Sequence, residues 1–248
     1  MARPKRSKGG PIINGYYKMS FHYDEMMEVV DYDEWFFFCE PYLKPTDKIL
    51  DLACGTGTLA ILFATEGYET FGLDISPYTI DIARDKARIA HVDIDFRVID
   101  MCEFDYGEEF DVITCFFDSL NFITTDRVPE VFDNVYKNLK KGGYFIFDVC
   151  TKAKLAEIDG DDFEGDLYFG HYRYQTTVEN ETIYHHVTIE DRLDPLDETY
   201  VEYYHDYHVL LDPRFELVKM VTDFTDKCDF ENGERLLMVL RKKWIDKT

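Results

Sequence analysis

The chain has 248 residues, of which 46% are hydrophobic and 16% aromatic, a composition that indicates one substantial globular core and excludes a disordered chain. Its formal net charge of −23 repels phosphate backbones, so we expect no nucleic-acid partner. No apolar run approaches the ~20 residues that a membrane helix needs, so no membrane partner is expected either.

In chain order, residues 1–19 are predicted to form a flexible basic tail. This segment lacks the apolar region of a secretory signal, so it is not expected to be one. An aromatic-rich helix is expected over residues 20–40, ending at Pro41. Apolar runs then alternate with helical patterns, which is typical of a parallel sheet covered on both faces. The predicted strands are 48–53, 69–73, 94–99, 110–115 and 143–149, and the predicted helices are 57–66, 77–90 and 126–139.

Residues at the helix ends support these bounds. Ser76 is a suitable N-cap for the second of these helices, and Asp126 for the third, with Pro129 in its first turn. The pair Gly142-Gly143 is predicted to end the third helix and to begin the fifth strand.

Residues 163–211 follow a period of two, which predicts a three-stranded antiparallel insert after the fifth strand. Two further strands are expected at 215–224 and 235–242, with no room for a helix at 211–215. The predicted organisation is a tail (1–19), a core with an N-terminal lid helix (20–150), an insert forming a substrate lid (151–211) and a C-terminal hairpin that completes the core sheet (212–248).

The most informative segment is residues 49–60, where an apolar strand reaches Asp51 and a turn with Gly55 and Gly57 leads into a helix. Glycine permits a sharp turn and close approach to a ligand. A strand, a glycine turn and a helix N-terminus form the nucleotide-cofactor pocket of open α/β sheets. The segment therefore predicts a nucleotide-type cofactor at this turn.

Two cofactor classes fit this turn. Gly55, Gly57 and Ala60 satisfy the permissive dinucleotide fingerprint, whose pyrophosphate would then lie near the charge of Asp51. S-adenosylmethionine has no phosphate and carries an ammonium and a sulfonium, both of which suit a carboxylate. The residues therefore favour S-adenosylmethionine over NAD.

Residues 51–57 also resemble the first motif of class I S-adenosylmethionine-dependent methyltransferases, with Ala53 in the first glycine position. Residues 68–76, 95–101, 110–121 and 139–148 resemble, in order, the second strand, the third strand, the fourth strand with its loop, and the turn into the fifth strand of that family. The glycine N-methyltransferase-like branch is among the most similar groups. The resemblance covers residues 20–150 well and the remainder loosely.

The resemblance implies a Rossmann-like, mostly parallel seven-stranded sheet of order 3-2-1-4-5-7-6, with an antiparallel last strand and a small antiparallel β insert after strand 5. It also implies donor contacts through Asp51 to the ammonium end, through Asp74 to the ribose and through Asp100 to the adenine. The remaining implied cofactor-binding residues are Ala53, Gly55, Gly57, Ile75, Met101, Phe116 and Tyr23.

The acceptor is expected to meet Asp118, Ser119 and Asn121, which follow the fourth strand at the carboxyl edge of the sheet. Asp118 and Asn121 are the candidate catalytic residues, and Asp118 would orient or deprotonate an amine. Loop residues without a catalytic role would look the same. The sequence lacks the Asn/Asp-Pro-Pro-Tyr loop typical of enzymes that methylate base amines.

Five histidines of the insert (His171, His185, His186, His205 and His208) have strand-like spacing and no metal-ligand pattern. Six scattered cysteines without a C-x-x-C motif indicate reduced thiols in a cytoplasmic protein with no metal site. No feature of the sequence specifies an oligomeric state.

The sequence thus predicts a cytoplasmic S-adenosylmethionine-dependent methyltransferase for a small-molecule acceptor. A nitrogen acceptor is preferred over oxygen because the protein is acidic and shows no obvious strong base. Two alternatives stay open at this point: a non-catalytic protein that binds S-adenosylmethionine, and an NAD-dependent oxidoreductase.

Overall fold

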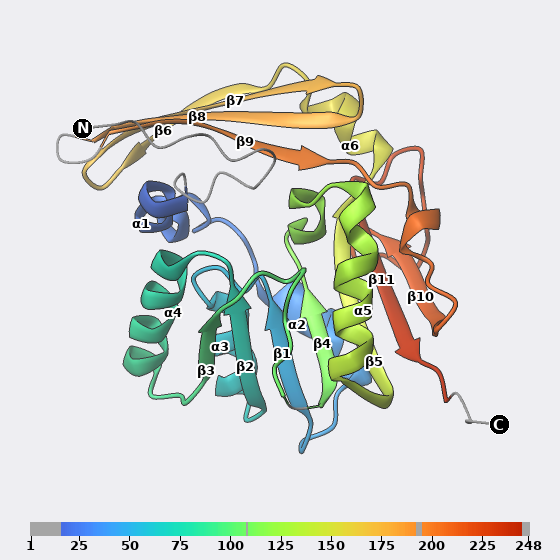
Figure 1. Ribbon diagram of the computed structural model, residues 1–248. Helices are drawn as coiled ribbons and strands as arrows, with labels where there is room; N and C mark the ends of the chain where they lie inside the picture. Colours follow the sequence, from blue (N-terminus) through green and yellow to red (C-terminus); the bar gives the residue numbers. More distant parts are fainter. Residues whose placement is uncertain (1–15, 108, 192–194, 245–248) are drawn as a thin grey trace, which may run out of the picture.

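The computed structural model describes residues 16–107, 109–191 and 195–244, which form a main sheet flanked by helices and a second sheet above it (Figure 1). The main sheet contains β1 (Lys48–Leu52), β2 (Glu69–Asp74), β3 (Asp95–Val98), β4 (Phe110–Cys115), β5 (Leu139–Cys150), β10 (Phe215–Thr222) and β11 (Arg235–Lys242). The second sheet, called the lid sheet below, contains β6 (Asp162–Leu167), β7 (Gly170–Glu179), β8 (Thr182–Asp191) and β9 (Leu196–Tyr203). The α-helices are α1 (Tyr16–Met26), α2 (Asp33–Cys39), α3 (Thr58–Thr65), α4 (Pro77–Ala90), α5 (Val128–Asn138) and α6 (Lys152–Ile158). The 3-10 helices are η1 (Glu40–Tyr42), η2 (Ser119–Phe122), η3 (Thr125–Arg127) and η4 (Tyr207–Leu210).

The main sheet has the order β10-β11-β5-β4-β1-β2-β3, which confirms the order predicted from the sequence. Strands β3, β2, β1, β4 and β5 are parallel neighbours, and β11 lies antiparallel between β5 and β10. The carboxyl ends of the parallel strands therefore meet at one edge, and the lid sheet lies across that edge (Figure 1).

Both faces of the main sheet are buried, as the alternation of strands and helices predicts. On one face, α5 packs against a cluster that includes Leu50, Ile113 and Phe147. On the other, α2 and α3 pack against Ile49, Val112 and Ile146. Successive residues of the buried strands thus face opposite helical layers, which explains why these strands are apolar throughout.

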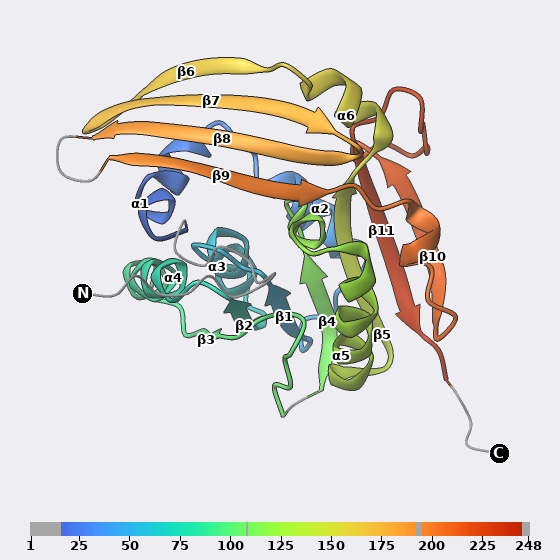
Figure 2. The same ribbon diagram turned by 45° about the horizontal axis from the view of Figure 1, so that its top comes forward.

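The insert has four strands, so the prediction of three was wrong. Residues 163–174 follow a single alternating pattern in the sequence, yet the chain reverses at Tyr168 and Phe169 and pairs β6 with β7. Exposed aromatic residues occupy the two central positions of this turn, with Tyr168 86% and Phe169 72% exposed, and Gly170 ends it. One face of the lid sheet covers α1 (Figure 2), and Met19 and Met26 of that helix pack against its apolar cluster.

Several predicted helix bounds were also wrong. The expected helix over 20–40 is two helices, α1 and α2, separated at residues 27–32. Asp126 lies within η3, and Arg127 is the N-cap of α5 without a side-chain cap bond. The pair Gly142-Gly143 lies inside β5, beside an irregular register between β4 and β5. Ser76 does cap α4, since its hydroxyl accepts from the Thr79 N–H at 3.3 Å.

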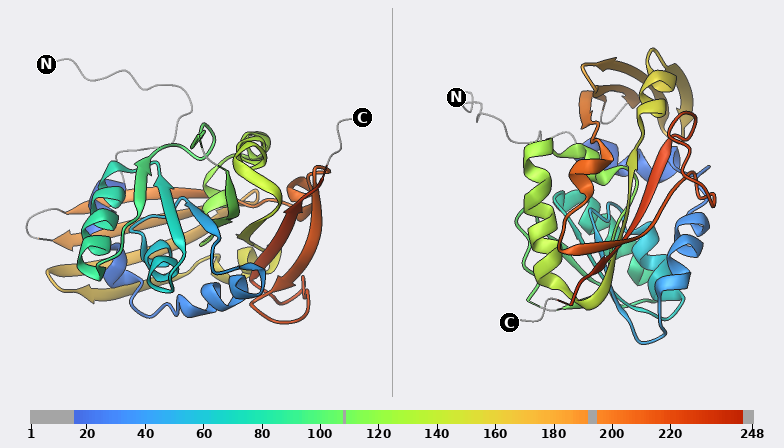
Figure 3. Two further views of the ribbon diagram at one scale, coloured as in Figure 1. Left: turned by 90° about the horizontal axis from the view of Figure 1, so that it is seen from below. Right: turned by 90° about the vertical axis from the view of Figure 1, so that its right-hand side faces the viewer.

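The connection between β9 and β10 contains only the 3-10 helix η4, which confirms that no α-helix fits before residue 215. The tail prediction for residues 1–15 falls outside the described residues, whereas residues 16–19 belong to α1. None of the helices in the described part of the chain combines the length and apolarity required to cross a bilayer. Seen along the sheet, the lid sheet and the main sheet form separate layers joined by α6 and by the chain after β9 (Figure 3).

Candidate active site

The turn after β1 has the backbone conformation that its sequence predicts. Ala53, Gly55 and Gly57 all have positive φ angles, of 53°, 53° and 77°. Ala53 thus adopts the left-handed conformation of the glycine that it replaces in the family motif. A Cβ on Gly55 would meet nothing within 4 Å, whereas a Cβ on Gly57 would lie 2.9 Å from both Ala83 Cβ and Phe96 Cζ. Gly55 therefore faces open space, and Gly57 permits close packing of α3 against α4 and β3.

This difference predicts separate effects for two substitutions. Gly57→Ala is expected to reduce the free energy of unfolding by about 3 kcal/mol, because it combines left-handed strain with overpacking. Gly55→Ala is expected to cost only about 1 kcal/mol of stability, from its backbone conformation alone. Urea denaturation measures both, and equal losses for the two variants would contradict the packing role of Gly57.

Asp51 lies at the end of β1 and is 3% exposed. Thr114 donates its hydroxyl to Asp51 Oδ1 at 2.8 Å, and no cation among the described residues pairs with this carboxylate. Burial raises the pKa of Asp51 to about 7, the Thr114 hydrogen bond opposes that shift, and the charge of Asp74 adds to it. A buried carboxylate without a cation suits a positively charged ligand and disfavours a pyrophosphate.

Asp74, at the end of β2, holds the glycine turn in place. Its Oδ2 accepts from the Gly55 N–H at 3.0 Å, and its Oδ1 accepts from the Ser76 N–H at 2.8 Å and from the Thr79 hydroxyl at 3.1 Å. Burial raises the pKa of Asp74, and these hydrogen bonds limit the shift. Oδ2 keeps lone-pair capacity for a further donor, because an ionised carboxylate has about four acceptor positions, two on each oxygen, and Oδ1 already accepts two hydrogen bonds.

The residues of this turn fit S-adenosylmethionine. Asp51 would hold the ammonium end, Gly55 would allow close approach, and Asp74 would accept the ribose hydroxyls. The bound compound supplies an activated methyl group, so the protein has to contribute mainly orientation. These individual contacts remain predictions.

The pKa of Asp51 makes donor affinity dependent on pH. At pH 5.5 most Asp51 is protonated in the free protein, and at pH 7.0 about half is ionised, so affinity for S-adenosylmethionine is expected to rise roughly tenfold between these pH values. The raised pKa of Asp51 also affects the stability of the ligand-free protein. Its contribution to stability is fully present below about pH 4 and is lost as the pH rises through about 7. Isothermal titration calorimetry at the two pH values measures the affinity change. In Asp51→Asn the rise should disappear, and an equal rise in that variant would contradict the assignment.

Asp100 and Met101 lie after β3, as the sequence predicts. Asp100 Oδ1 accepts from the Cys102 N–H at 2.9 Å, and Asp100 Oδ2 lies 3.6 Å from the guanidinium of Arg127. Met101 is 8% exposed and belongs to the core cluster under α5, and Ile75 is partly buried between β2 and α4. The adenine contact predicted for Asp100 and Met101 stays a prediction.

The chain after β4 turns sharply into η2. Phe117 and Asp118 are consecutive non-glycine residues with positive φ angles, of 59° and 57°. Phe117 stacks on Trp35 of α2 with ring centroids 4.3 Å apart, and the Asp118 N–H donates to Asp148 Oδ1 at 2.8 Å. These contacts hold a strained turn at the carboxyl edge of the sheet, and such strain is typical of functional sites.

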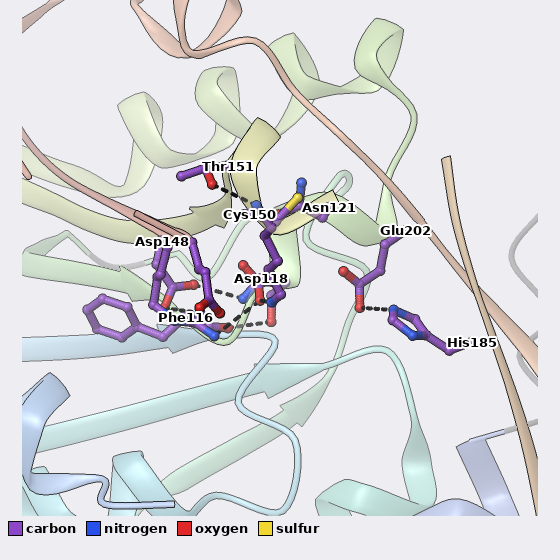
Figure 4. Close-up of polar contacts among 12 residues, drawn as sticks. Phe116, Asp118, Asn121, Asp148, Cys150, Thr151, His185 and Glu202 are labelled. Atoms are coloured by element: carbon purple, nitrogen blue, oxygen red, sulfur yellow. Dashed lines mark hydrogen bonds and ion pairs between the residues drawn. The ribbon is translucent and has the colours of Figure 1, made fainter. Parts of the chain in front are cut away.

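Asp118 belongs to an ion cluster, defined here as Asp118, Asp148, Lys154 and Arg235, in which the two carboxylates are buried and the two cations are partly buried (Figure 4 shows the two carboxylates). Lys154 Nζ lies 2.7 Å and Arg235 Nη2 3.2 Å from Asp118 Oδ2. Arg235 Nη1 and Trp35 Nε1 each donate to Asp148 Oδ2 at 2.8 Å. Despite burial, Arg235 and Lys154 hold the pKa of Asp118 below its usual value. Asp118 Oδ1 is buried and has no hydrogen-bond partner, which leaves one strong acceptor for a ligand.

The sequence indicated Asp118 but not the residues that position it. Asp148 follows an apolar run in β5. A charged residue within such a strand was the one indication in the sequence that Asp148 has a role at the site. Lys154 lies on α6, a seven-residue helix that the sequence analysis did not predict, and Arg235 begins β11.

Asn121 and Ser119 make structural contacts beside Asp118. Asn121 is 0% exposed, its amide donates to the Tyr203 carbonyl at 2.7 Å, and its carbonyl accepts from the Cys150 N–H at 3.1 Å. The Ser119 hydroxyl donates to the Phe116 carbonyl at 2.7 Å, and Phe116 itself is buried. Asn121 therefore joins η2 to the ends of β5 and β9. The acceptor contacts of both residues, and the donor contact of Phe116, stay predictions.

Helix α1 brings Tyr23 to the site. Burial raises the pKa of Tyr23, with smaller contributions from Tyr32, Asp24 and Asp74, so the phenol lies near the acid at the end of β2. The neighbouring Asp24 fastens α1, since Lys86 of α4 donates to its Oδ2 at 2.7 Å. Trp35, by contrast, packs against Phe117 and the ion cluster.

The five insert histidines are dispersed, and the described part of the chain contains no group of residues able to hold a metal ion. His205 is 1% exposed between the Thr125 hydroxyl and the Leu120 carbonyl, each at 3.0 Å. His171, His186 and His208 lie at the surface near carboxylates. His185 is the one that faces the site, and its surroundings are described below.

Comparison with known proteins agrees with this geometry. Residues 49–143 match a family model described as "Methyltransferase domain". A Geobacillus sp. (strain WCH70) protein named "Putative methyltransferase GWCH70_2453" is 31% identical over 92% of this chain and 99% of its own length. The chain belongs to the class I S-adenosylmethionine-dependent methyltransferases.

Solved structures of this methyltransferase family share the fold. A Clostridium acetobutylicum S-adenosylmethionine-dependent methyltransferase superposes with a TM-score of 0.78 and 26% identity, covering 92% of this chain and 99% of that one. The sugar N-methyltransferase KedS8 of Streptoalloteichus sp. gives a TM-score of 0.75 at 18% identity, covering 98% of this chain and 99% of that one, which shows the fold alone. The methyltransferase therefore uses S-adenosylmethionine. A closer relation to the glycine N-methyltransferase-like branch stays a prediction.

Proposed function

We propose that this methyltransferase transfers a methyl group to a nitrogen atom of a small-molecule acceptor. The main support is the unpartnered, buried Oδ1 of Asp118 at the carboxyl edge of the sheet. A carboxylate oxygen can only accept hydrogen bonds when ionised, so it suits a donor group such as an amine. The lid sheet above this edge would enclose a small acceptor, and the net charge of −23 opposes a nucleic acid.

The catalytic task of this chain would be to orient the acceptor and to accept its proton. Asp118 is held by Lys154, Arg235 and the strained turn, so its carboxylate is fixed before the acceptor binds. Orientation of this kind supplies up to about 7–11 kcal/mol in favourable cases. Asn121 would act by joining the turn to β5 and β9, and Ser119 by fixing the end of β4.

The alternatives considered from the sequence are not favoured. An NAD-dependent oxidoreductase would place a pyrophosphate beside the buried Asp51, and the family assignment points to a different cofactor. A non-catalytic protein would not need the ordered carboxylate at Asp118. KedS8 is a sugar N-methyltransferase, but at 18% identity it shows the fold alone, and the support for a nitrogen acceptor comes from the residues of this chain. A cytoplasmic location is part of the proposal, and it agrees with six free cysteines.

A metabolite library assayed for release of S-adenosylhomocysteine tests the proposal. The library should contain amines together with the matched alcohols, so that the two acceptor atoms are compared directly. We expect turnover with one or more amines and not with their alcohol partners. Turnover of alcohols alone would contradict the nitrogen acceptor, and failure of the protein to bind S-adenosylmethionine would contradict the function itself.

A further inference from the structure

The inner face of the lid sheet contains a second buried polar pair above Asp118. Residues on β8 alternate, so that Ile183, His185, Val187 and Ile189 are buried while their neighbours are more exposed. Within this apolar row His185 is 8% exposed, and Glu202 of β9 beside it is 9% exposed. Burying polar side chains in such an apolar row is costly unless their hydrogen bonds are satisfied.

The pair is incompletely satisfied. His185 Nε2 lies 3.1 Å from Glu202 Oε1, within ion-pair distance, but the geometry gives Nε2 no hydrogen bond. The other ring nitrogen, Nδ1, lies 3.3 Å from the Thr176 hydroxyl. One buried imidazole nitrogen is therefore free to exchange a proton.

Glu202 lies close to the ion cluster of Asp118, Asp148, Lys154 and Arg235. Burial raises the pKa of the Cys150 thiol, and Asp118 and Glu202 raise it further, so both carboxylates lie near this thiol. Asp118 and, less strongly, Glu202 raise the pKa of Lys154 against the effect of burial. In the view of Figure 4, Glu202 lies between His185 and Asp118.

The charges of this region do not balance. Every recorded partner of Asp148 is a hydrogen-bond donor, as are those of Asp118, so both carboxylates fit their ionised forms. Counting Glu202 as a carboxylate and His185 as neutral gives three carboxylates against the two cations Lys154 and Arg235, which leaves one negative charge in excess. A single additional positive charge would neutralise the site.

We infer that the acceptor is a primary or secondary aliphatic amine, which binds as an ammonium ion between Asp118 and Glu202, and that His185 is the base that takes its proton. This inference rests on the proposed function and names its substrate class and base. A neutral alcohol would leave the excess charge in place, and its alkoxide would add a further negative charge beside three carboxylates.

The proton transfer keeps the charge of the site constant. The ammonium gives one proton to His185 Nε2, and the positive charge moves to the imidazolium, where Glu202 stabilises it. The nitrogen lone pair of the neutral amine forms the new N–CH3 bond while the S–CH3 bond breaks, and its electron pair remains on sulfur in S-adenosylhomocysteine. The product nitrogen carries the positive charge, and His185 returns its proton to solvent.

Tyr174 of β7 lies beside the imidazole. Its ring lies 5.3 Å from that of His185, and it packs against the apolar cluster of the lid sheet. Burial raises the pKa of Tyr174, and the charge of Glu202 raises it further.

A binding experiment tests the ammonium site without knowledge of the natural acceptor. Isothermal titration of the complex with S-adenosylhomocysteine would compare n-butylammonium with n-butanol. We expect butylammonium to bind the wild type at least tenfold more tightly than butanol, and Glu202→Gln to remove most of this difference. Equal affinities for the two probes, or an unchanged preference in Glu202→Gln, would overturn the ammonium site.

A kinetic experiment with an amine that the wild type methylates tests the base. His185→Gln should lower kcat about 10²–10⁴-fold, and the loss of activity toward acidic pH between about pH 5 and 8 should become flatter. The matched control is His186→Gln, because His186 lies on the same strand and faces the opposite side, where it is exposed near Asp197. A pH profile in His185→Gln that equals the wild-type profile would overturn the role of the base.

Measuring the binding of S-adenosylmethionine distinguishes a failure of this inference from a failure of the proposed function. We expect His185→Gln and Glu202→Gln to bind it within about twofold of the wild type, and thermal unfolding should confirm that both variants fold. If His185→Gln does not fold, His185→Asn takes its place. Methylation of amines by a wild type that shows no preference for butylammonium, with an unchanged pH profile in His185→Gln, would overturn this inference alone. Methylation of alcohols and not amines, or loss of donor binding by the wild type, would overturn the proposed function as well.

Discussion

Replacing Arg235 with leucine is expected to reduce the free energy of unfolding by about 3–5 kcal/mol, because removal of one member of a buried ion pair leaves its partners uncompensated. Arg235 contacts both Asp118 and Asp148, and Asp148 is fully buried. Burial disfavours the charge of Arg235, yet Asp148 and Asp118 raise its pKa, so the guanidinium stays charged. Guanidinium chloride denaturation followed by circular dichroism measures the loss.

Arg241→Leu is the matched control for that prediction. Arg241 lies on the same strand, is exposed, and donates only to the Gly142 carbonyl at 3.2 Å. Its loss is expected to change stability by less than about 0.5 kcal/mol. If the two arginine variants were equally stable, the ion cluster would not be a determinant of the fold.

Asp74→Asn is expected to weaken binding of S-adenosylmethionine by about 10- to 100-fold, which corresponds to the loss of a hydrogen bond to a charged acceptor, worth about 1.5–3 kcal/mol. The oxygens of Asp74 accept hydrogen bonds from Gly55, Ser76 and Thr79. In Asp74→Asn the NH2 group of the new side chain would replace one of these oxygens, so two donors would face each other. Isothermal titration calorimetry at pH 7.0 measures the affinity.

Asp81→Asn provides the comparison for Asp74. Asp81 lies on α4 near the site but is exposed and pairs only with Arg84 at 3.3 Å. We expect wild-type affinity in this variant. Normal donor binding by Asp74→Asn would reject the ribose assignment, while a loss in both variants would indicate a general effect of negative charge.

The strands of the main sheet could be predicted because their determinants are local, whereas the order of the strands was implied by the resemblance to the methyltransferase family. Each parallel strand is a short apolar run, and Gly55 and Gly57 mark the turn after the first one. The acids at the strand ends, Asp51 and Asp74, follow from the same pattern, since parallel strands bring their carboxyl ends to one edge.

The errors have equally physical causes. Tyr168 and Phe169 are aromatic residues of the kind enriched in strands, and they occupy the centre of the turn that Gly170 ends, so the sequence of β6 and β7 resembles that of a single strand. No glycine or proline separates α1 from α2, and the break depends on packing of α2 against Phe117 and of α1 against the lid sheet. Tertiary contacts of this kind override local preference.

The acceptor side was least predictable because distant segments build it. Arg235 and Asp148 are 87 positions apart, and Lys154 and Asp118 are 36 apart. The sequence shows the charge of each residue but not which charges meet. Only the pairing of β11 with β5 brings Arg235 beside the end of β4.

That pairing has a consequence for the synthesis of the protein. The donor-binding motif is complete once the ribosome has translated residues 49–143, but Asp118, the carboxylate proposed to face the acceptor, waits for Arg235, which is translated later. A nascent chain interrupted before β11 would therefore carry the methyl-donor half of the enzyme with an unfinished acceptor half. Competence for methyl transfer is thereby tied to translation of β11.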